Sequence, residues 1–167
     1  MTLSDRIAVM ARGKVLQIAT PKEIYTRPAD LEVASFIGQM NFFECKVEKI
    51  ENEEIHLHAA GLGRIRAENS PLARPGGDVI AAVRPEKLRV SGGKPAPGEN
   101  CARGVIAAAA YLGDRSHYHV RVDGCSKPVA VATQDGSGSS TGHLAEGSSV
   151  WISWTTDALL LLEKGDA

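Results

Sequence analysis

The sequence predicts a mainly β protein in which an antiparallel barrel or sandwich follows a short α+β segment. Two observations carry this prediction. Helix signals are confined to the first 40 residues, and from residue 41 onward short alternating runs are separated by Gly, Pro, Asn and Asp. Many short strands in about 125 residues favour a closed sheet or a sandwich over an open sheet. We therefore expect two parts, residues 1–40 and 41–167.

The first part opens with a predicted β-hairpin. Residues 6–10 and 14–18 are β-prone runs on either side of Ala-Arg-Gly. Gly13 suits the turn because glycine adopts positive φ without steric cost. A two-stranded hairpin is marginal alone, so it must pack against another element.

Two short helices are predicted after the hairpin. Thr20, Pro21 and Glu23 have the spacing of a capping box with proline at the first helical position, which predicts a helix through Tyr25. A second helix is expected from Asp30, with an apolar stripe that ends at a glycine, residue 38. The Arg-Pro pair at residues 27–28 separates the two helices.

The second part contains ten predicted strands. They cover residues 42–50, 54–58, 63–67, 79–84, 87–90, 101–112, 116–122, 129–133, 149–154 and 159–162. Two stretches rich in Gly, Pro and Ser, residues 91–100 and 134–142, are predicted as surface loops. We expect the first loop to separate two halves of the β-region and the second to lie at the tip of a hairpin. The sequence shows no internal repeat strong enough to claim.

Composition excludes several classes of protein. Lys+Arg number 19 against Asp+Glu 20, and aromatic residues make up 5%, which disfavours a nucleic-acid-binding protein. Cys45, Cys101 and Cys125 lack a C-x-x-C spacing and are expected to be free thiols in a reducing cytoplasm. Residues 1–14 carry charges unlike those of a signal peptide, and the longest apolar run, residues 105–112, is too short to span a membrane.

No motif for catalysis is present in the sequence. The phosphate-binding pattern G-x-x-x-x-G-K-[ST] is missing, and Gly92-Gly93-Lys94 is followed by proline rather than by a helix start. Neither a G-x-S-x-G elbow nor an H-E-x-x-H pair occurs. We therefore expect this chain to be non-catalytic.

Four histidines are candidate metal ligands. His56 and His58, and likewise His117 and His119, are spaced so that each pair shares one face of a strand. Four imidazoles from two strands could hold Zn²⁺. The alternate positions in both strands are apolar, so the preferred interpretation places the histidines toward solvent or a subunit interface.

Two charged turns are the candidate ligand or interface sites. Arg84-Pro-Glu86 ends a strand and could form an ion pair or bind a small anion. Asp114-Arg115 is predicted as a tight turn, with a ligand contact as the alternative. Arg84, Arg115 and His117 are the candidate anion donors. In the last long strand, alternation predicts that Trp154 points into the core. We prefer a role in closing the core to a role as a platform on which a ligand stacks.

The chain resembles the end of the ATP-binding subunit of bacterial ABC importers. Residues 3–25, with Ile-Ala-Val-Met-Ala-Arg-Gly-Lys-Val at their centre, and residues 33–38 resemble the segment that follows the switch histidine in importers of spermidine/putrescine, iron(III) and sugars. Val-Arg-Pro-Glu-Lys-Leu-Arg at residues 83–89, together with residues 104–115, 119–124 and 150–154, is similar to the transport-associated OB (TOBE) domain. The β-region looks most like the polyamine-type branch.

This resemblance implies an OB-like or MOP-like antiparallel β-barrel with a regulatory role, preceded by a remnant of the nucleotide-binding domain. The family's subunits dimerise, hydrolyse ATP with Mg²⁺ and drive a membrane permease from the cytoplasmic side of the inner membrane. The resemblance implies no cofactor in this chain, a homodimer, permease partners, a possible small-molecule or anion regulator, and no nucleic acid. An oxyanion-sensing or small-ligand barrel that acts independently is the alternative.

Overall fold

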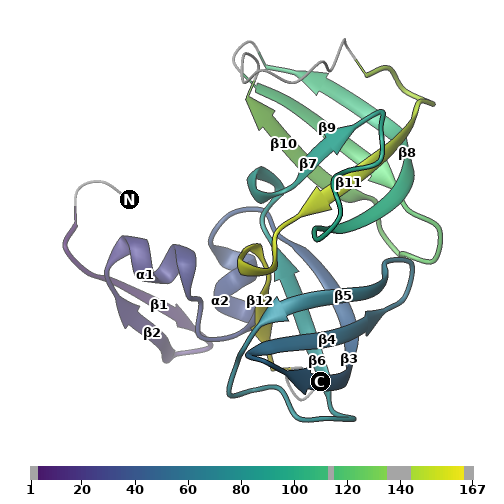
Figure 1. Ribbon diagram of the computed structural model, residues 1–167. Coiled ribbons are helices and arrows are strands. Elements are labelled where there is room, and N and C mark those ends of the chain that lie inside the picture. Colours follow the sequence, from purple (N-terminus) through teal and green to yellow (C-terminus); the bar gives the residue numbers. More distant parts are fainter. Residues whose placement is uncertain (1–3, 113–114, 135–143, 164–167) are drawn as a thin grey trace.

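The computed structural model describes residues 4–112, 115–134 and 144–163 (Figure 1). An N-terminal segment lies beside a β-domain made of two five-stranded antiparallel sheets. The N-terminal elements are β1 (Ile7–Ala11), β2 (Lys14–Ala19), α1 (Pro21–Thr26) and α2 (Leu31–Phe36). The β-domain contains β3 (Asn41–Glu51), β4 (Glu54–Ala59), β5 (Gly63–Glu68), β6 (Asp78–Val83), η1 (Pro85–Lys87), β7 (Arg89–Ser91), β8 (Asn100–Tyr111), β9 (Arg115–Arg121), β10 (Val129–Gln134), β11 (Ser149–Trp154), η2 (Thr156–Ala158) and β12 (Leu160–Leu162). The mainly β class is confirmed.

Local signals set the ends of the two helices as the sequence predicts. The hydroxyl of Thr20 accepts from the Glu23 amide at 3.3 Å, and the Glu23 carboxylate accepts from the Thr20 amide at 3.0 Å. The same Thr20 amide holds the pKa of Glu23 below its usual range. Asp30 accepts from the Val33 amide at 2.8 Å and so starts α2, which stops before Gly38 with its φ of 80°.

The two five-stranded sheets have one and the same strand order. One runs β12-β6-β3-β4-β5 and the other β7-β11-β8-β9-β10. Each half of the β-domain thus contributes four strands to one sheet and one short strand to the other sheet. β7 follows β6 in the chain but pairs with β11, whereas β12 follows β11 but pairs with β6. The β-domain therefore consists of two structural repeats. The sequence does not show this repeat because the matched positions mostly carry different residues.

Matched details support the repeat. A β-bulge falls between Val47 and Lys49 in β3 and between Ile106 and Ala108 in β8. Each bulge lies at the same distance from the asparagine that begins its strand. Both long strands therefore bend at equivalent points.

Two buried asparagines tie the sheets together. The amide of Asn41 donates to the Ala130 carbonyl at 2.9 Å and its oxygen accepts from the Ala130 amide at 2.8 Å. Asn100 makes the equivalent pair with the Arg66 backbone, at 2.8 and 2.7 Å. Each asparagine thereby satisfies the backbone of the edge strand in the other sheet, β10 or β5.

The two halves touch at a pair of glycine turns. Gly61 and Gly124 both have positive φ, 80° and 88°. A Cβ on Gly61 would lie 2.7 Å from the Cys125 backbone nitrogen, and a Cβ on Gly124 would lie 2.9 Å from the Gly61 Cα. Only glycine fits this crossing, because both the backbone conformation and the space exclude a side chain.

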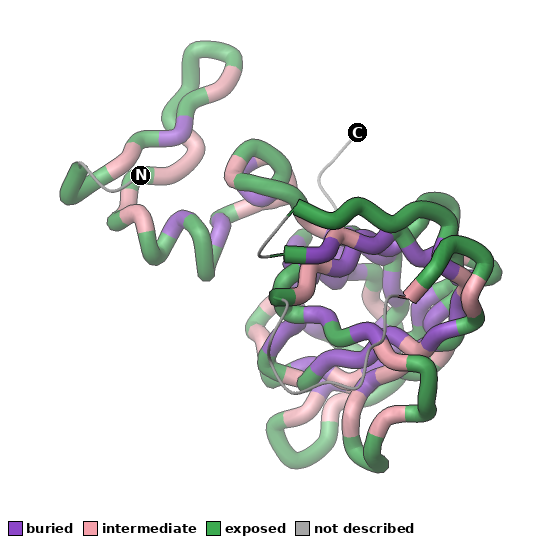
Figure 2. Tube along the Cα trace, turned by 90° about the horizontal axis from the view of Figure 1, so that it is seen from above, coloured by how far each residue is buried: buried purple, intermediate pink, exposed green. Residues whose placement is uncertain are grey.

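A single apolar core fills the space between the sheets (Figure 2). It includes Ile106, Val120 and Trp154 from one sheet and Val47 and Leu57 from the other. The alternation predicted for the last long strand is confirmed, since Trp154 points into this core. Burial of such residues from both halves supplies the main driving force for the fold.

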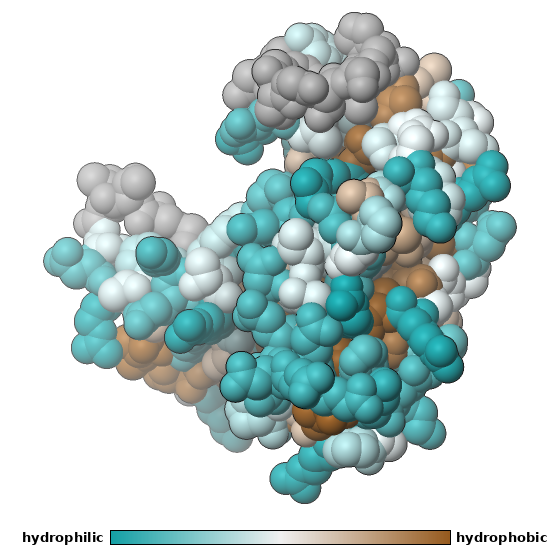
Figure 3. Space-filling view, viewed as in Figure 1, coloured by the Kyte–Doolittle hydropathy of each residue, from teal (hydrophilic) through white to brown (hydrophobic). Residues whose placement is uncertain are grey.

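Two smaller apolar clusters hold the N-terminal segment. One packs the hairpin on the helices through Val9, Ile24 and Val33, and the other packs Ala34 of α2 on Ile80, Ala82 and Leu162 of the β-domain. The opposite face of the hairpin is apolar and exposed, with Met10, Val15 and Ile18 each at least half accessible (Figure 3).

Three expectations for the β-region need correction. Residues 87–90 do not form one strand, because Pro85 begins a 3-10 turn and the strand is Arg89–Ser91. The loop at 91–100 does not separate the halves: it joins β7 to β8 within one sheet, and the chain changes sheets at residues 84–88 and 155–159. Because β10 and β11 are not neighbours, the segment between them does not tip a hairpin. Residues 135–142 of that segment lie outside the described residues.

Candidate functional site

Arg84 lies at the point where the chain leaves the first sheet. Its side chain is buried, with 5% of the residue exposed, and it reaches the C-terminal ends of both N-terminal helices. Nε and Nη2 donate to the Tyr25 carbonyl at 3.2 and 2.6 Å, and Nη1 donates to the Ile37 carbonyl at 2.9 Å. The guanidinium therefore satisfies carbonyl groups that each helix leaves without an internal partner.

The Tyr25 side chain completes this arrangement. Its ring lies under the guanidinium, with Arg84 Cζ 3.5 Å from the ring centroid, and its hydroxyl donates to the Glu86 carboxylate. Burial, followed by the hydrogen bond to Glu86, raises the pKa of Tyr25. We refer to Arg84, Tyr25, Glu86 and the Ile37 carbonyl as the Arg84 joint.

The Arg84 joint connects three parts of the molecule. Arg84 precedes η1, Glu86 lies within η1, and η1 packs against β10 of the second sheet. Within the described part of the chain Arg84 forms no ion pair, so its charge is balanced by carbonyl dipoles and the ring face. A displacement of the helices would leave this buried charge without partners, which makes the joint stiff.

The predicted anion-binding residues do not converge on a site. Arg84 is not available as an anion donor because each guanidinium nitrogen already donates to a carbonyl, and Glu86 pairs with Tyr25 instead of Arg84. Arg115 and His117 lie on β9 in the other sheet. Asp114 falls outside the described residues. The predictions from the sequence did not include the contact between Arg84 and Tyr25. The two residues are 59 positions apart, and no local sequence pattern indicates such a contact.

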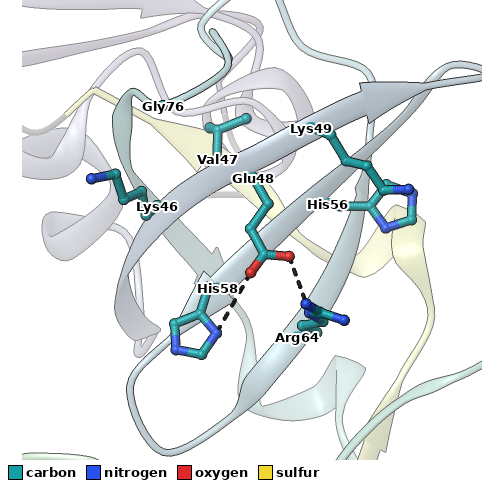
Figure 4. Close-up of a pocket in the computed structure, with 8 residues that line it drawn as sticks. All are labelled: Lys46, Val47, Glu48, Lys49, His56, His58, Arg64 and Gly76. Atoms are coloured by element: carbon teal, nitrogen blue, oxygen red, sulfur yellow. Dashed lines mark ion pairs between the residues drawn. The ribbon is translucent and has the colours of Figure 1, made fainter.

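A shallow groove of about 940 Å³ crosses the outer face of β3 and β4 (Figure 4). It opens beside the β3 bulge, and its lining residues are Lys46, Val47, Glu48, Lys49, His56, His58, Arg64 and Gly76. Glu48 lies between Arg64, at 3.2 Å, and His58, at 4.0 Å. Arg64 is largely exposed, so this pair contributes little to stability.

The histidine pairs lie on different sheets. His56 and His58 belong to β4, whereas His117 and His119 belong to β9, so four imidazoles do not meet. Across the described ranges, no group of three or more His, Cys, Asp or Glu side chains could hold a metal ion. The helices in those ranges also include none long and apolar enough to cross a membrane.

The fold and the sequence define the class of this protein. Residues 81–162 match the model of the TOBE domain family. They contain Arg84, both points at which the chain changes sheets, and the whole second half of the repeat. Residues 81–162 therefore belong to the TOBE domain family.

Its relatives are ATP-binding proteins of importers. The chain is 38% identical over 164 residues to the spermidine/putrescine import ATP-binding protein PotA of Rubrobacter xylanophilus, with 97% of this chain and 42% of the relative covered. It is 35% identical over 170 residues to PotA of Acidothermus cellulolyticus, with 100% and 43% covered. The chain thus spans about two-fifths of the length of these relatives. This agrees with the resemblance to the end of an ABC importer ATP-binding subunit.

A solved structure supports the OB-like and MOP-like fold. The cytoplasmic molybdate-binding protein ModG aligns with a TM-score of 0.63 and 16% identity, covering 74% of this chain and 95% of ModG. At that identity the likeness concerns the fold alone.

Proposed function

We propose that this chain is the non-catalytic regulatory end of the ATP-binding subunit of an ABC importer of the polyamine type. In this proposal the chain supplies no residue to the ATP and Mg²⁺ site. It acts on the cytoplasmic side of the inner membrane, in a homodimer of ATP-binding subunits held there by permease partners. Regulation consists in transmitting the state of the β-domain to the nucleotide-binding part.

The observation that carries the proposal is the Arg84 joint. The similarity to importer subunits runs through both the N-terminal segment and the β-domain, and Arg84 binds these two parts to each other through Tyr25 and Ile37. A regulatory domain needs a stiff mechanical link to the part that it regulates. A loosely tethered domain would make the same contacts in every state of that part, and so could not favour one state over another. The buried guanidinium supplies that link.

The exposed face of the hairpin supports the same proposal. Ala8 pairs with Ile18, and Met10 pairs with Val15, so their side chains share the face turned away from the helices. An apolar face on a two-sided hairpin requires a covering layer in the functional protein. The additional length of the relatives can supply it.

The test is a chimera. The matching two-fifths of the Rubrobacter xylanophilus relative would be replaced by this chain, and ATP hydrolysis would be measured for the chimera, the intact relative and the isolated chain. We expect hydrolysis by the chimera and the relative and none by the isolated chain. Hydrolysis by the isolated chain would contradict the proposal, as would a folded chimera that neither binds nor hydrolyses ATP.

Association through the β-domain is tested separately by analytical ultracentrifugation. A concentration-dependent dimer of the chain, retained when Met10 and Ile18 are changed to lysine, supports dimerisation through the β-domain. A strict monomer, or a dimer lost in that variant, contradicts it.

Independent oxyanion sensing is the second candidate, and the groove lined by Lys46, Lys49 and Arg64 is the feature that favours it. Cationic side chains from β3 and β5, on either side of β4, can bind an oxyanion. Thermal melting with molybdate, sulfate, phosphate and spermidine tests it, because a ligand of the folded state raises the melting temperature. A melting temperature unmoved by the three anions removes this candidate.

A further inference from the structure

The outer face of the second sheet carries a tryptophan among basic side chains. Trp151 of β11 lies directly opposite Arg103 of β8 in the register, and Val105, two residues further along β8, lies opposite Arg121 of β9. Paired residues share a face, and side chains two apart on a strand also do so. Lys94 reaches over the indole, with Nζ 5.6 Å from the ring centroid. We call Trp151, Arg103, Arg121 and Lys94 the basic face.

The charges of the basic face have no acidic partner among the described residues. Arg103, Arg121 and Lys94 are exposed, and among the described residues no carboxylate forms an ion pair with any of them. A nearby acid, Glu99, is paired with Arg89 at 2.5 Å. The basic face is therefore a local positive field on a chain whose net charge is −1.

The equivalent surface of the other sheet differs both in the residue at the position of the tryptophan and in the pairing of its charges. Ile80 occupies the position matched to Trp151, and it is buried in a cluster with Ala34 of α2. Three basic side chains of that sheet also have acidic partners, in the Glu48–Arg64, Lys49–Glu51 and Arg66–Glu54 pairs. At the position matched to Trp151 the first sheet is thus covered by α2, and three of its basic side chains have counter-charges, whereas no described element covers the basic face and no described carboxylate pairs with it.

Charge and composition indicate what would cover the basic face. Tryptophan and arginine are the residues that most often dominate binding energy at protein interfaces, with an aromatic anchor at the centre and charges around it. A second copy placed face to face would oppose arginine to arginine, so self-association through this surface is unfavourable. Single-stranded nucleic acid requires successive aromatic platforms, and the basic face offers one.

We propose that the basic face is a docking surface for an acidic protein segment whose apolar side chain contacts Trp151 while its carboxylates pair with Arg103 and Arg121. Lys94 then moves from the indole to a carboxylate of the partner. The inference does not rest on the proposed transport function, because every residue involved belongs to this chain and none belongs to the Arg84 joint.

The test uses the full chain and defined probes. Fluorescein-labelled peptides of fifteen residues, one with Glu and Asp around a central Leu-Phe pair and one with Lys in place of every acid, are titrated by fluorescence anisotropy. A (dT)12 oligonucleotide and phosphatidylglycerol vesicles are tested in parallel. We expect saturable binding of the acidic peptide that weakens as salt is raised, and no binding of the lysine peptide.

Variants locate the contact. Arg103→Glu and Arg121→Glu should each weaken acidic-peptide binding at least tenfold, and Trp151→Ala should do the same at unchanged salt dependence. Arg74→Glu, at an exposed loop arginine outside this face, is the matched control and should leave binding unchanged; melting curves verify that every variant is folded. Equal binding of both peptides, full binding by the Arg103 and Arg121 variants, binding of only (dT)12 or vesicles, or no binding of any probe would each overturn the proposal.

Discussion

Replacement of Arg84 by methionine should detach the N-terminal helices from the β-domain without unfolding the β-domain. The change keeps most of the side-chain length but removes three donated hydrogen bonds and the cation over Tyr25. Two carbonyl groups, those of Tyr25 and Ile37, then lose their charged donor. A hydrogen bond to a charged group contributes about 1.5–3 kcal/mol, and a cation–π contact about 1 kcal/mol.

These values predict a loss of about 3 kcal/mol in the free energy that keeps the helices docked, after allowance for water reaching the freed carbonyls. That loss corresponds to roughly a hundred-fold increase in the equilibrium for local opening. Hydrogen exchange followed by mass spectrometry should show faster exchange in α1 and α2. The central strands β3, β6 and β8 should keep their protection, because the large core contains no residue of the joint.

Two further variants make this result specific. Arg84→Lys keeps the charge but cannot bridge both carbonyls, so we expect an intermediate effect. Arg89→Met removes an exposed arginine whose pair with Glu99 is worth about 0.5 kcal/mol or less, and it should leave exchange unchanged. Exchange that accelerates equally in the helices and the β-domain, or in neither, would refute the reasoning that Arg84 is a local joint.

Other perturbations give smaller or differently located effects. Because the pKa of Tyr25 is raised in the folded state, stability should be fully present below pH 10 and decline as the pH rises above it; Tyr25→Phe should remove that decline in alkaline unfolding curves. Burial raises the pKa of Cys45 to about 11, so iodoacetamide at pH 8 should alkylate it only after unfolding, as mass spectrometry would show. Gly61→Ala should cost about 3 kcal/mol in denaturant unfolding through backbone strain and overlap, whereas Gly63→Ala, which has open space around it, should cost about 1 kcal/mol. A common cost at both glycines would argue against the tight crossing.

Local features of the sequence determined the elements of this protein. Thr20 and Asp30 start the helices because a side chain within three residues satisfies their first amides, and these contacts need no tertiary structure. Alternation placed Trp154 in the core for a similar reason, since successive residues of a strand point to opposite faces. The helix boundaries, the mainly β class and the resemblance to importer subunits were therefore all readable from the chain.

The pairing of distant segments was decided only by the tertiary structure. The exchange of β7 and β12 between the sheets, the role of Arg84 and the crossing at Gly61 each join residues 50 or more positions apart, where no short-range spacing constrains the partner. The sequence presented Arg84 as a charged residue beside a proline, equally fit to bind an anion. In the folded protein two helix ends lie beside Arg84, and its buried guanidinium donates to their carbonyl groups. A buried guanidinium without acceptors would cost more free energy than binding an exposed anion would contribute.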